Sequence, residues 1–85
     1  MRYKVEISKK ALKQLKDLPV AQYNKVRHGI YALADNPRGH NSIKLADTEN
    51  EYRLRVGNYR ILYTIEDKIL YIFVFEVADR KDAYR

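Results

Sequence analysis

The chain has 85 residues, a formal net charge of +6 and no cysteine. A chain of this length holds one hydrophobic core, so we expect a single domain over residues 1–85. The lack of cysteine excludes a disulfide scaffold, and the two histidines are not spaced as zinc ligands, so we expect no metal and no cofactor. A hydrophobic fraction of 46% is too high for a disordered chain.

The sequence also bears on location and partners. The longest apolar run, residues 69–77, is interrupted by Glu76 and is too short to cross a bilayer. The first residues begin an alternating pattern and contain no apolar signal-peptide segment. We therefore expect a cytoplasmic protein without membrane contact. Its 17 basic residues against 11 acidic ones favour a polyanionic partner, either nucleic acid or an acidic protein segment.

The N-terminal half predicts a strand followed by two helices. Alternating apolar and charged residues over positions 3–7 indicate the strand. Leucines at helical spacing indicate a helix over residues 9–18, with Ser8 as its N-cap. Pro19 ends that helix, and a second helical pattern runs over residues 20–34. The apolar residues that define the two patterns are Leu12, Leu15 and Leu18, then Tyr23, Val26, Ile30 and Leu33.

The C-terminal half predicts strands separated by polar turns. The strand patterns cover residues 43–45, 52–56, 59–65 and 69–77. Gly57-Asn58 is typical of a two-residue hairpin turn, and the near-continuous apolar run of the last strand predicts burial on both of its faces. The expected fold class is α+β: an N-terminal strand, a two-helix hairpin, then a four-stranded antiparallel sheet with the helices on one face.

The hairpin turn fixes the register of the strands on either side of it. If Val56 faces Tyr59, then Arg55 lies directly opposite Arg60, and Arg53 lies on the same face. Like charges in directly opposite positions destabilise a sheet by roughly some tenths of a kcal/mol. Guanidinium groups bind phosphate and carboxylate through two parallel N–H donors. We therefore interpret this face, which we call the arginine face, as an anion-binding site.

The next hairpin extends the arginine face. A turn of even length places Tyr71, Phe73 and Phe75 on it, whereas an odd loop or a bulge reverses that assignment. Arginines interleaved with aromatic rings suit single-stranded nucleic acid, through phosphate pairing and base stacking. Two alternatives stay open: Phe73 and Phe75 form a second small core, or Glu51 or Glu76 neutralises the arginines.

Two motifs resemble those of the RelE/ParE toxin superfamily. The run YRLRVGNYRILY at residues 52–63 is similar to its strand signature, and VADRKDAY at residues 77–84 resembles its closing motif. The basic first helix and Asn36-Pro37 after the second agree with this resemblance. It implies a toxin of a type II toxin–antitoxin system that enters the ribosomal A site and cleaves mRNA there.

The resemblance also implies roles for five residues. As catalytic residues, Arg60 and Arg80 hold the scissile phosphate and stabilise its charge, and Tyr84 stacks on a base or orients the nucleophile. Arg53 and Arg55 bind the substrate by positioning its backbone. An alternative for Tyr84 is that it anchors the tail. No metal is required when arginines hold the phosphate.

One departure from the family pattern concerns proton transfer. Several branches have a histidine just before the C-terminal arginine, and Asp79 stands there in this chain. No general base is therefore evident. Three alternatives stay open. The ribosome compensates by positioning the mRNA strictly. Alternatively, a carboxylate takes the proton (Asp79, Glu76 or Glu51), or catalysis is weak or absent. We expect His28 and His40 to be structural or solvated because neither falls on the arginine face.

The partners implied by the resemblance are a cognate antitoxin with an acidic segment, the ribosome with its mRNA, and operator DNA reached only through the antitoxin. Two other functions stay open. One is a ParE-like toxin that inhibits DNA gyrase and is no nuclease, and the other is a degenerate toxin that retains only antitoxin binding. The basic side of the first helix is either solvated or contacts ribosomal RNA. It carries Lys9, Lys10, Lys13 and Lys16.

Overall fold

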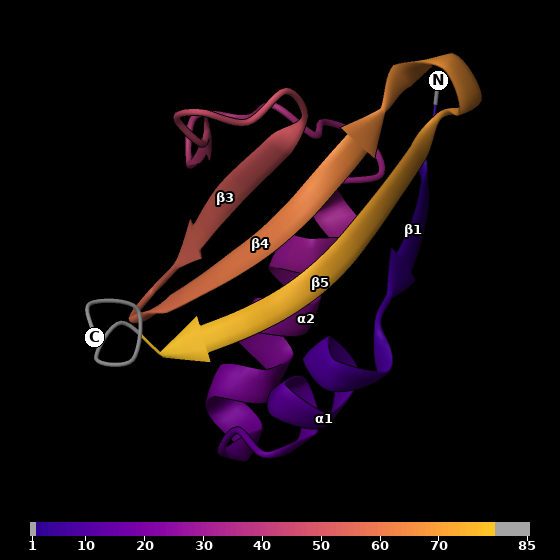
Figure 1. The fold of residues 1–85 in the computed structure, drawn as a ribbon. Coiled ribbons are helices and arrows are strands. Elements are labelled where there is room, and N and C mark those ends of the chain that lie inside the picture. Colours follow the sequence, from indigo (N-terminus) through magenta and orange to yellow (C-terminus); the bar gives the residue numbers. More distant parts are fainter. Residues whose placement is uncertain (1, 80–85) are drawn as a thin grey trace.

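The computed structural model describes residues 2–79, which form five strands, two α-helices and one short 3-10 helix (Figure 1). In chain order these are β1 (Lys4–Ile7), α1 (Lys9–Lys16), α2 (Val20–Ala32), β2 (Ser42–Lys44), β3 (Glu51–Val56), β4 (Tyr59–Glu66), the 3-10 helix η1 (Asp67–Ile69) and β5 (Tyr71–Asp79). The α+β class expected from the sequence is confirmed. No helix within residues 2–79 is long and apolar enough to cross a membrane.

All five strands belong to one sheet, in the order β1-β5-β4-β3-β2. Strands β2 to β5 pair antiparallel, as expected. The N-terminal strand β1 joins the same sheet and pairs in parallel with β5, with Val5 opposite Ile72. The sheet is therefore mixed and has one strand more than the expected four, because a parallel neighbour can be supplied from the distant end of a chain through a long crossover.

Helix α1 begins as expected, and one of its leucines is exposed. The backbone N–H of Ala11 donates to Oγ of the N-cap Ser8 at 3.0 Å. Ala11 and Leu15 are buried one turn apart, whereas Leu12, one of the leucines whose spacing predicted the helix, is 38% exposed. Residues four apart lie on the face that packs on the sheet, and Leu12 lies at the margin of that face. The helix also ends at Lys16, two residues before the expected end.

Helix α2 starts directly after Pro19, whose carbonyl accepts the N–H of Tyr23 at 2.8 Å. Val26 and Ile30, one turn apart, are fully buried, and Leu33 just after the helix is buried as well. These positions confirm the helical pattern, although the helix ends at Ala32 and not at residue 34.

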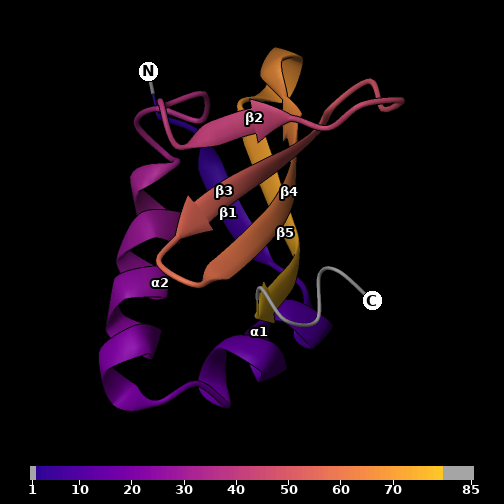
Figure 2. The same ribbon diagram turned by 90° about the vertical axis from the view of Figure 1, so that its left-hand side faces the viewer.

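Both helices lie on one face of the sheet, and no helix of the described residues covers the other face (Figures 1 and 2). Helix α2 approaches β3 closely: a Cβ added to Gly29 would lie 2.9 Å from Cγ2 of Val56. The hydrophobic core fills the space between the helices and the sheet. Its buried residues are Ala11, Leu15, Val26, Ile30, Leu33, Leu54, Ile61, Tyr63, Ile65, Ile72, Val74 and Val77.

A β-bulge divides β5 into two parts. Tyr63 of β4 pairs with Val74, but the preceding Leu62 pairs with Glu76, so Phe75 is an extra residue without a ladder partner. Two residues of the bulged strand then oppose one on its neighbour, which shifts the alternation of faces by one residue. The bulge therefore keeps Val74 in the core and also turns Glu76 toward the open face.

Strand β5 is fully buried on one face only. Ile72 and Val74 are completely buried under the helices. Tyr71 and Phe73 lie on the open face, where they are half-buried and stack with ring centroids 6.4 Å apart. The expected burial on both faces was wrong, because nothing in residues 2–79 forms a second layer over these rings.

The edge of β5 beyond Val74 is covered by α1 and not by another strand. The N–H of Ser8 donates to the carbonyl of Val74 at 2.9 Å, and the N–H of Val77 donates to Oε1 of Gln14 at 2.8 Å. These bonds satisfy backbone groups that an open sheet edge leaves unpaired. They also hold α1 beside the part of β5 that carries Glu76.

A polar network, which we call the Arg38 clasp, joins the loop after α2 to η1. Arg38 donates from Nη1 and Nη2 to the two carboxylate oxygens of Asp67, at 3.1 and 2.8 Å. Its Nε donates to Oη of Tyr52 at 3.2 Å, and Tyr3 donates its hydroxyl to Asp67 at 2.6 Å. The hydrogen bonds from Arg38 and Tyr3 lower the pKa of the Asp67 carboxyl below its ordinary value.

Candidate functional site on the open face of the sheet

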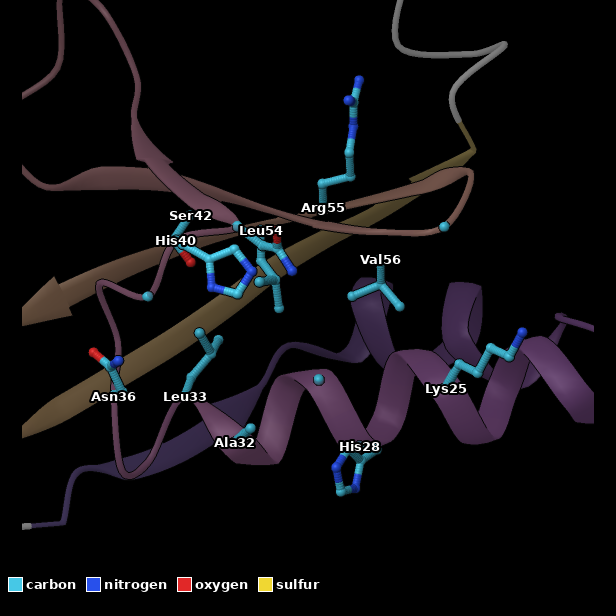
Figure 3. Close-up of a pocket in the computed structure, with 14 residues that line it drawn as sticks. Lys25, His28, Ala32, Leu33, Asn36, His40, Ser42, Leu54, Arg55 and Val56 are labelled. Carbon is cyan, nitrogen blue, oxygen red and sulfur yellow. The ribbon is translucent and has the colours of Figure 1, made fainter.

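The β3–β4 hairpin places two arginines directly opposite each other. Gly57 adopts φ 58°, the left-handed conformation that a two-residue hairpin turn requires. Val56 then pairs with Tyr59, and Arg55 pairs with Arg60, which confirms the register expected from the sequence. Arg55 is exposed, and its guanidinium points away from α2 (Figure 3).

Arg53 and Arg60 line a shallow pocket of about 260 Å³ on this open face, which we call the arginine pocket. The ladder places Arg53, Leu62 and Glu76 in one row across β3, β4 and β5. The apolar side chain of Leu62 therefore forms the floor of the arginine pocket, and the carboxylate of Glu76 stands at the end of the row opposite Arg53. The residues lining the pocket are Leu45, Arg53, Arg60, Leu62, Glu76 and Ala78.

Two residues further along the ladder, on the same face, a row contains Arg55, Arg60 and Ala78. Because the side chain of Ala78 is small, this row leaves room beside Arg60. The structure thus brings Arg53, Arg55 and Arg60 onto one face, in rows two residues apart, as the hairpin register predicted.

The two pocket arginines are partly desolvated. Their Nε atoms are buried, and among the described residues the Nε of Arg53 has no hydrogen-bond partner. A buried N–H without an acceptor is costly, and an anion in the pocket would supply acceptor oxygens. Charge-assisted hydrogen bonds of guanidinium to phosphate are also stronger than neutral ones.

Glu76 brings a carboxylate to the arginine pocket and connects it to α1. Its Oε1 accepts a hydrogen bond from Nζ of Lys10 at 2.7 Å, and its side chain is 30% exposed. Glu76 therefore lies beside the pocket arginines, while its ion pair is with Lys10. Sequence reasoning did not foresee this role of Lys10, because only the parallel β1–β5 pairing brings the start of α1 next to β5.

The remaining residues expected at the site differ in whether the structure describes them. Arg80 and Tyr84 lie outside the described residues. Asp79, the last described residue, pairs with Tyr59 and lines a cavity on the helix side together with Lys25. Asp79 therefore faces away from the arginine pocket.

The aromatic residues of β5 share the arginine face but do not alternate with the arginines. Phe73 pairs with Thr64, whereas Arg60 pairs with Ala78 at the other end of the strands. Tyr71 lies farther still from the arginine pocket, and its hydroxyl donates to Glu6 at 3.2 Å. The interleaving of rings and guanidinium groups expected from the sequence was therefore wrong for Tyr71 and Phe73.

A larger cavity, of about 460 Å³, lies between α2 and β3 on the helix side (Figure 3). Leu33 and Leu54 line it, and the ring of His40 lies beside Leu54, whereas His28 points away from the sheet. Both histidines are exposed and lie off the arginine face, as expected. Residues 2–79 contain no cluster of three or more His, Cys, Asp or Glu side chains that could hold a metal ion.

The chain combines a mixed sheet, two helices on one face and directly paired arginines on the other face. Residues 5–84 match the family model described as the ParE toxin of the type II toxin–antitoxin system parDE. The chain is 33% identical to the candidate toxin RelE1 of Methanocaldococcus jannaschii over 100% of this chain and 98% of that protein. It therefore belongs to the RelE/ParE superfamily of type II toxins.

Solved structures agree with this assignment. The RelE of an archaeal RelE–RelB complex from Pyrococcus horikoshii superposes with a TM-score of 0.83 at 32% identity, covering 94% of this chain and 97% of that one. The RelB–RelE complex from Methanococcus jannaschii gives 0.74 at 26% identity, covering 92% and 93%. A free RelE mutant from E. coli, at 22% identity, gives 0.80 over 99% and 90% and shows the shared fold alone.

Proposed function

We propose that this toxin is a ribosome-dependent mRNA endonuclease that acts without a metal and so inhibits translation. The observation that carries the proposal is the opposition of Arg55 and Arg60 beside the arginine pocket. A chain selected for stability alone would rarely pair like charges in a sheet, and a bound polyanion turns their repulsion into attraction. The surplus of six positive charges supports a nucleic-acid substrate.

The reaction that suits these residues is transesterification by the neighbouring 2′-hydroxyl of the RNA. It requires a base for the 2′-hydroxyl proton, cations for the charge that develops on the phosphorus oxygens, and a proton for the leaving 5′-oxygen. Arg60, together with Arg80, holds the scissile phosphate and stabilises that charge. Arg53 and Arg55 position the backbone on either side of it.

The roles of Arg80 and Tyr84 are carried over from the family motif, since both lie outside the described residues. Arg80 directly follows the strand that forms one wall of the arginine pocket. Tyr84 is proposed to stack on a base or to orient the nucleophile. We also propose that residues 1–85 act as one domain, which the match of the family model over residues 5–84 supports.

The proposed partner is a cognate antitoxin. The relatives from Pyrococcus horikoshii and Methanococcus jannaschii were solved as complexes of RelE with RelB. An acidic antitoxin segment over the open face would neutralise the arginines that meet there. Operator DNA is then bound only through the antitoxin, and the free toxin acts in the cytoplasm, where ribosomes are.

Inhibition of DNA gyrase is the second candidate function, because the matching family model is that of ParE. It predicts DNA-damage signalling and uncut mRNA after expression of the toxin. A degenerate toxin predicts no growth defect at all. The three functions share one fold, so the fold cannot distinguish them. Whether mRNA is cleaved after expression of the toxin distinguishes the endonuclease from the other two.

Primer extension on mRNA from cells that express the toxin tests the proposal. The wild-type chain is expected to produce breaks within translated codons, and purified ribosomes should be required for the same breaks in vitro. Arg60→Ala should abolish them and relieve growth arrest. Arg27→Ala is the matched control, because Arg27 is an exposed arginine of α2 that contacts Tyr31 on the helix side. Intact mRNA with the wild-type toxin would overturn the proposal.

A further inference from the structure

The proposed cleavage lacks an assigned proton acceptor, and the structure distinguishes the three carboxylates that the sequence left open. Asp79 lies on the helix side of the sheet. Glu51 is on the open face but pairs with Thr64, two rows beyond the row of Arg53. Among the described residues, Glu76 is the one carboxylate that lines the arginine pocket.

Glu76 and Arg53 stand on the two outer strands of one row, with β4 between them. The two residues are separated by Leu62 in the same row, so their backbones lie about 10 Å apart, twice the usual spacing of strands. A nucleotide on the apolar floor of Leu62 would have guanidinium groups on one side and the carboxylate on the other. This arrangement differs from an ion pair, in which the carboxylate would contact the arginine itself.

Lys10 holds the Glu76 carboxylate through one of its two oxygens. The bond from Nζ of Lys10 is made to Oε1 at 2.7 Å, and no described residue makes a hydrogen bond to Oε2. Lys10 sits in the first turn of α1, which is fixed to the same edge of β5 by the Ser8 and Gln14 bonds. A base that is oriented by a second group is the usual arrangement in sites where a proton is abstracted from a nucleophile.

We infer that Glu76 accepts the proton of the attacking 2′-hydroxyl and that Lys10 is its positioning residue, an inference that rests on the proposed endonuclease function. The 2′-oxygen forms a bond to phosphorus as its proton moves to Oε2 of Glu76. The bond from phosphorus to the 5′-oxygen breaks, and that oxygen takes a proton from water. Glu76 later returns its proton to solvent, so the products are a 2′,3′-cyclic phosphate and a 5′-hydroxyl end.

The test is single-turnover cleavage of ribosome-bound mRNA. Glu76→Gln should slow cleavage by about a hundredfold or more, the usual contribution of a general base, while its binding to programmed ribosomes and its melting temperature stay near wild type. Glu51→Gln, the same chemical change on the same face but outside the arginine pocket, should cleave at the wild-type rate. In Glu76→Ala, added formate should restore part of the rate, and it should restore none in Arg60→Ala.

Lys10 is tested by separating binding from turnover. Lys10→Met should lower kcat with little change in KM, and Lys10→Arg should recover most of the rate because it keeps the donor to Oε1. Lys13→Met is the control for the loss of one positive charge from α1.

The outcomes separate the inference from the function on which it rests. If the wild-type toxin does not cleave, the proposed function fails. If it cleaves and Glu76→Gln cleaves equally fast or faster, Glu76 only repels the phosphate and the inference is wrong. If Glu76→Gln is slow only because it is unfolded, its melting temperature will fall and formate will not rescue Glu76→Ala, which also overturns the inference.

Discussion

Arg55 of β3 and Arg60 of β4 occupy directly paired positions on the open face of the sheet. This opposition costs stability in the free protein, because each guanidinium raises the potential at the other. Arg55→Thr removes the repulsion and introduces a residue that suits strands. We expect the free energy of unfolding to rise by about 0.2–1 kcal/mol, measured by urea denaturation at low salt.

The same variant should bind RNA more weakly. Loss of one phosphate contact should reduce the slope of log affinity against log salt by about 1. Lys68→Thr on η1 provides a control for net charge, since Lys68 lies beyond the far end of β4. An Arg55→Thr variant that is less stable than wild type would show that the arginine pair is stabilised within the free chain.

The Arg38 clasp should make stability depend on acid pH. The pKa of Asp67 is lowered in the folded protein, chiefly by Arg38, so the contribution of its carboxylate is fully present above the ordinary value of 3.8 and is lost as the pH falls through the folded value. Asp67→Asn should therefore lower the melting temperature at pH 7, and its melting temperature should converge with that of wild type once the pH falls below the folded pKa of Asp67. Because the clasp is exposed, high salt should shrink the difference.

Asp35→Asn is the matched control for the clasp. Asp35 makes one bond to Nε of Arg2, at 3.2 Å, and both side chains are largely exposed. Single exposed ion pairs of this kind contribute little. Equal effects of the two asparagine variants at pH 7 would contradict the clasp.

Tyr63 should contribute to stability through its hydroxyl. Its side chain is completely buried, and the hydroxyl donates to the carbonyl of Pro37 at 2.7 Å. Burial raises the pKa of this hydroxyl. Tyr63→Phe keeps the ring that stacks on Tyr52 but leaves the buried carbonyl without this donor, so we expect a loss of about 1 kcal/mol in denaturant titration.

Tyr31→Phe serves as the comparison for Tyr63→Phe, because Tyr31 is 45% exposed. It should stay within about 0.5 kcal/mol of wild type. A comparable loss in both variants would mean that the buried hydrogen bond has no special weight.

Gly29 should resist replacement even though it lies inside a helix. Alanine has the better helix propensity by about 1 kcal/mol, but a Cβ at position 29 would lie 2.9 Å from Cγ2 of Val56. The stiff side chain of Val56 cannot rotate away easily, and overpacking costs about 1–3 kcal/mol. We expect Gly29→Ala to be destabilised by about 1 kcal/mol in urea denaturation.

A double-mutant cycle with Val56→Ala tests the cause. If the clash is responsible, Gly29→Ala should cost less in the Val56→Ala background, with a coupling of at least about 0.5 kcal/mol. Additive effects would place the cost elsewhere in α2.

The features that could be predicted from the sequence are those with a local signal. Gly57-Asn58 sets a two-residue turn, and from that turn alone follow the pairing of Arg55 with Arg60 and the faces of β3 and β4. The helical pattern of α2 likewise identifies Val26 and Ile30 as core residues.

The features that could not be predicted depend on contacts between distant parts of the chain. The parallel pairing of Val5 with Ile72 joins residues from the two ends of the sequence, and no local pattern encodes it. The exposure of Leu12 follows from where α1 docks on β5. The bond between Lys10 and Glu76 depends on both the parallel pairing and the bulge, so residue types alone could name Glu76 as a candidate but could not place it.

The extra residue Phe75 reverses the alternation of faces along β5. Before it, the even-numbered residues Ile72 and Val74 face the core, and after it the even-numbered Glu76 faces the open side. Deleting Phe75 would reverse the faces of the residues that follow it, which would place the Glu76 carboxylate in the hydrophobic core and expose Val77 to solvent. In this chain, the single residue Phe75 therefore decides whether Glu76 lies among the arginines or under the helices.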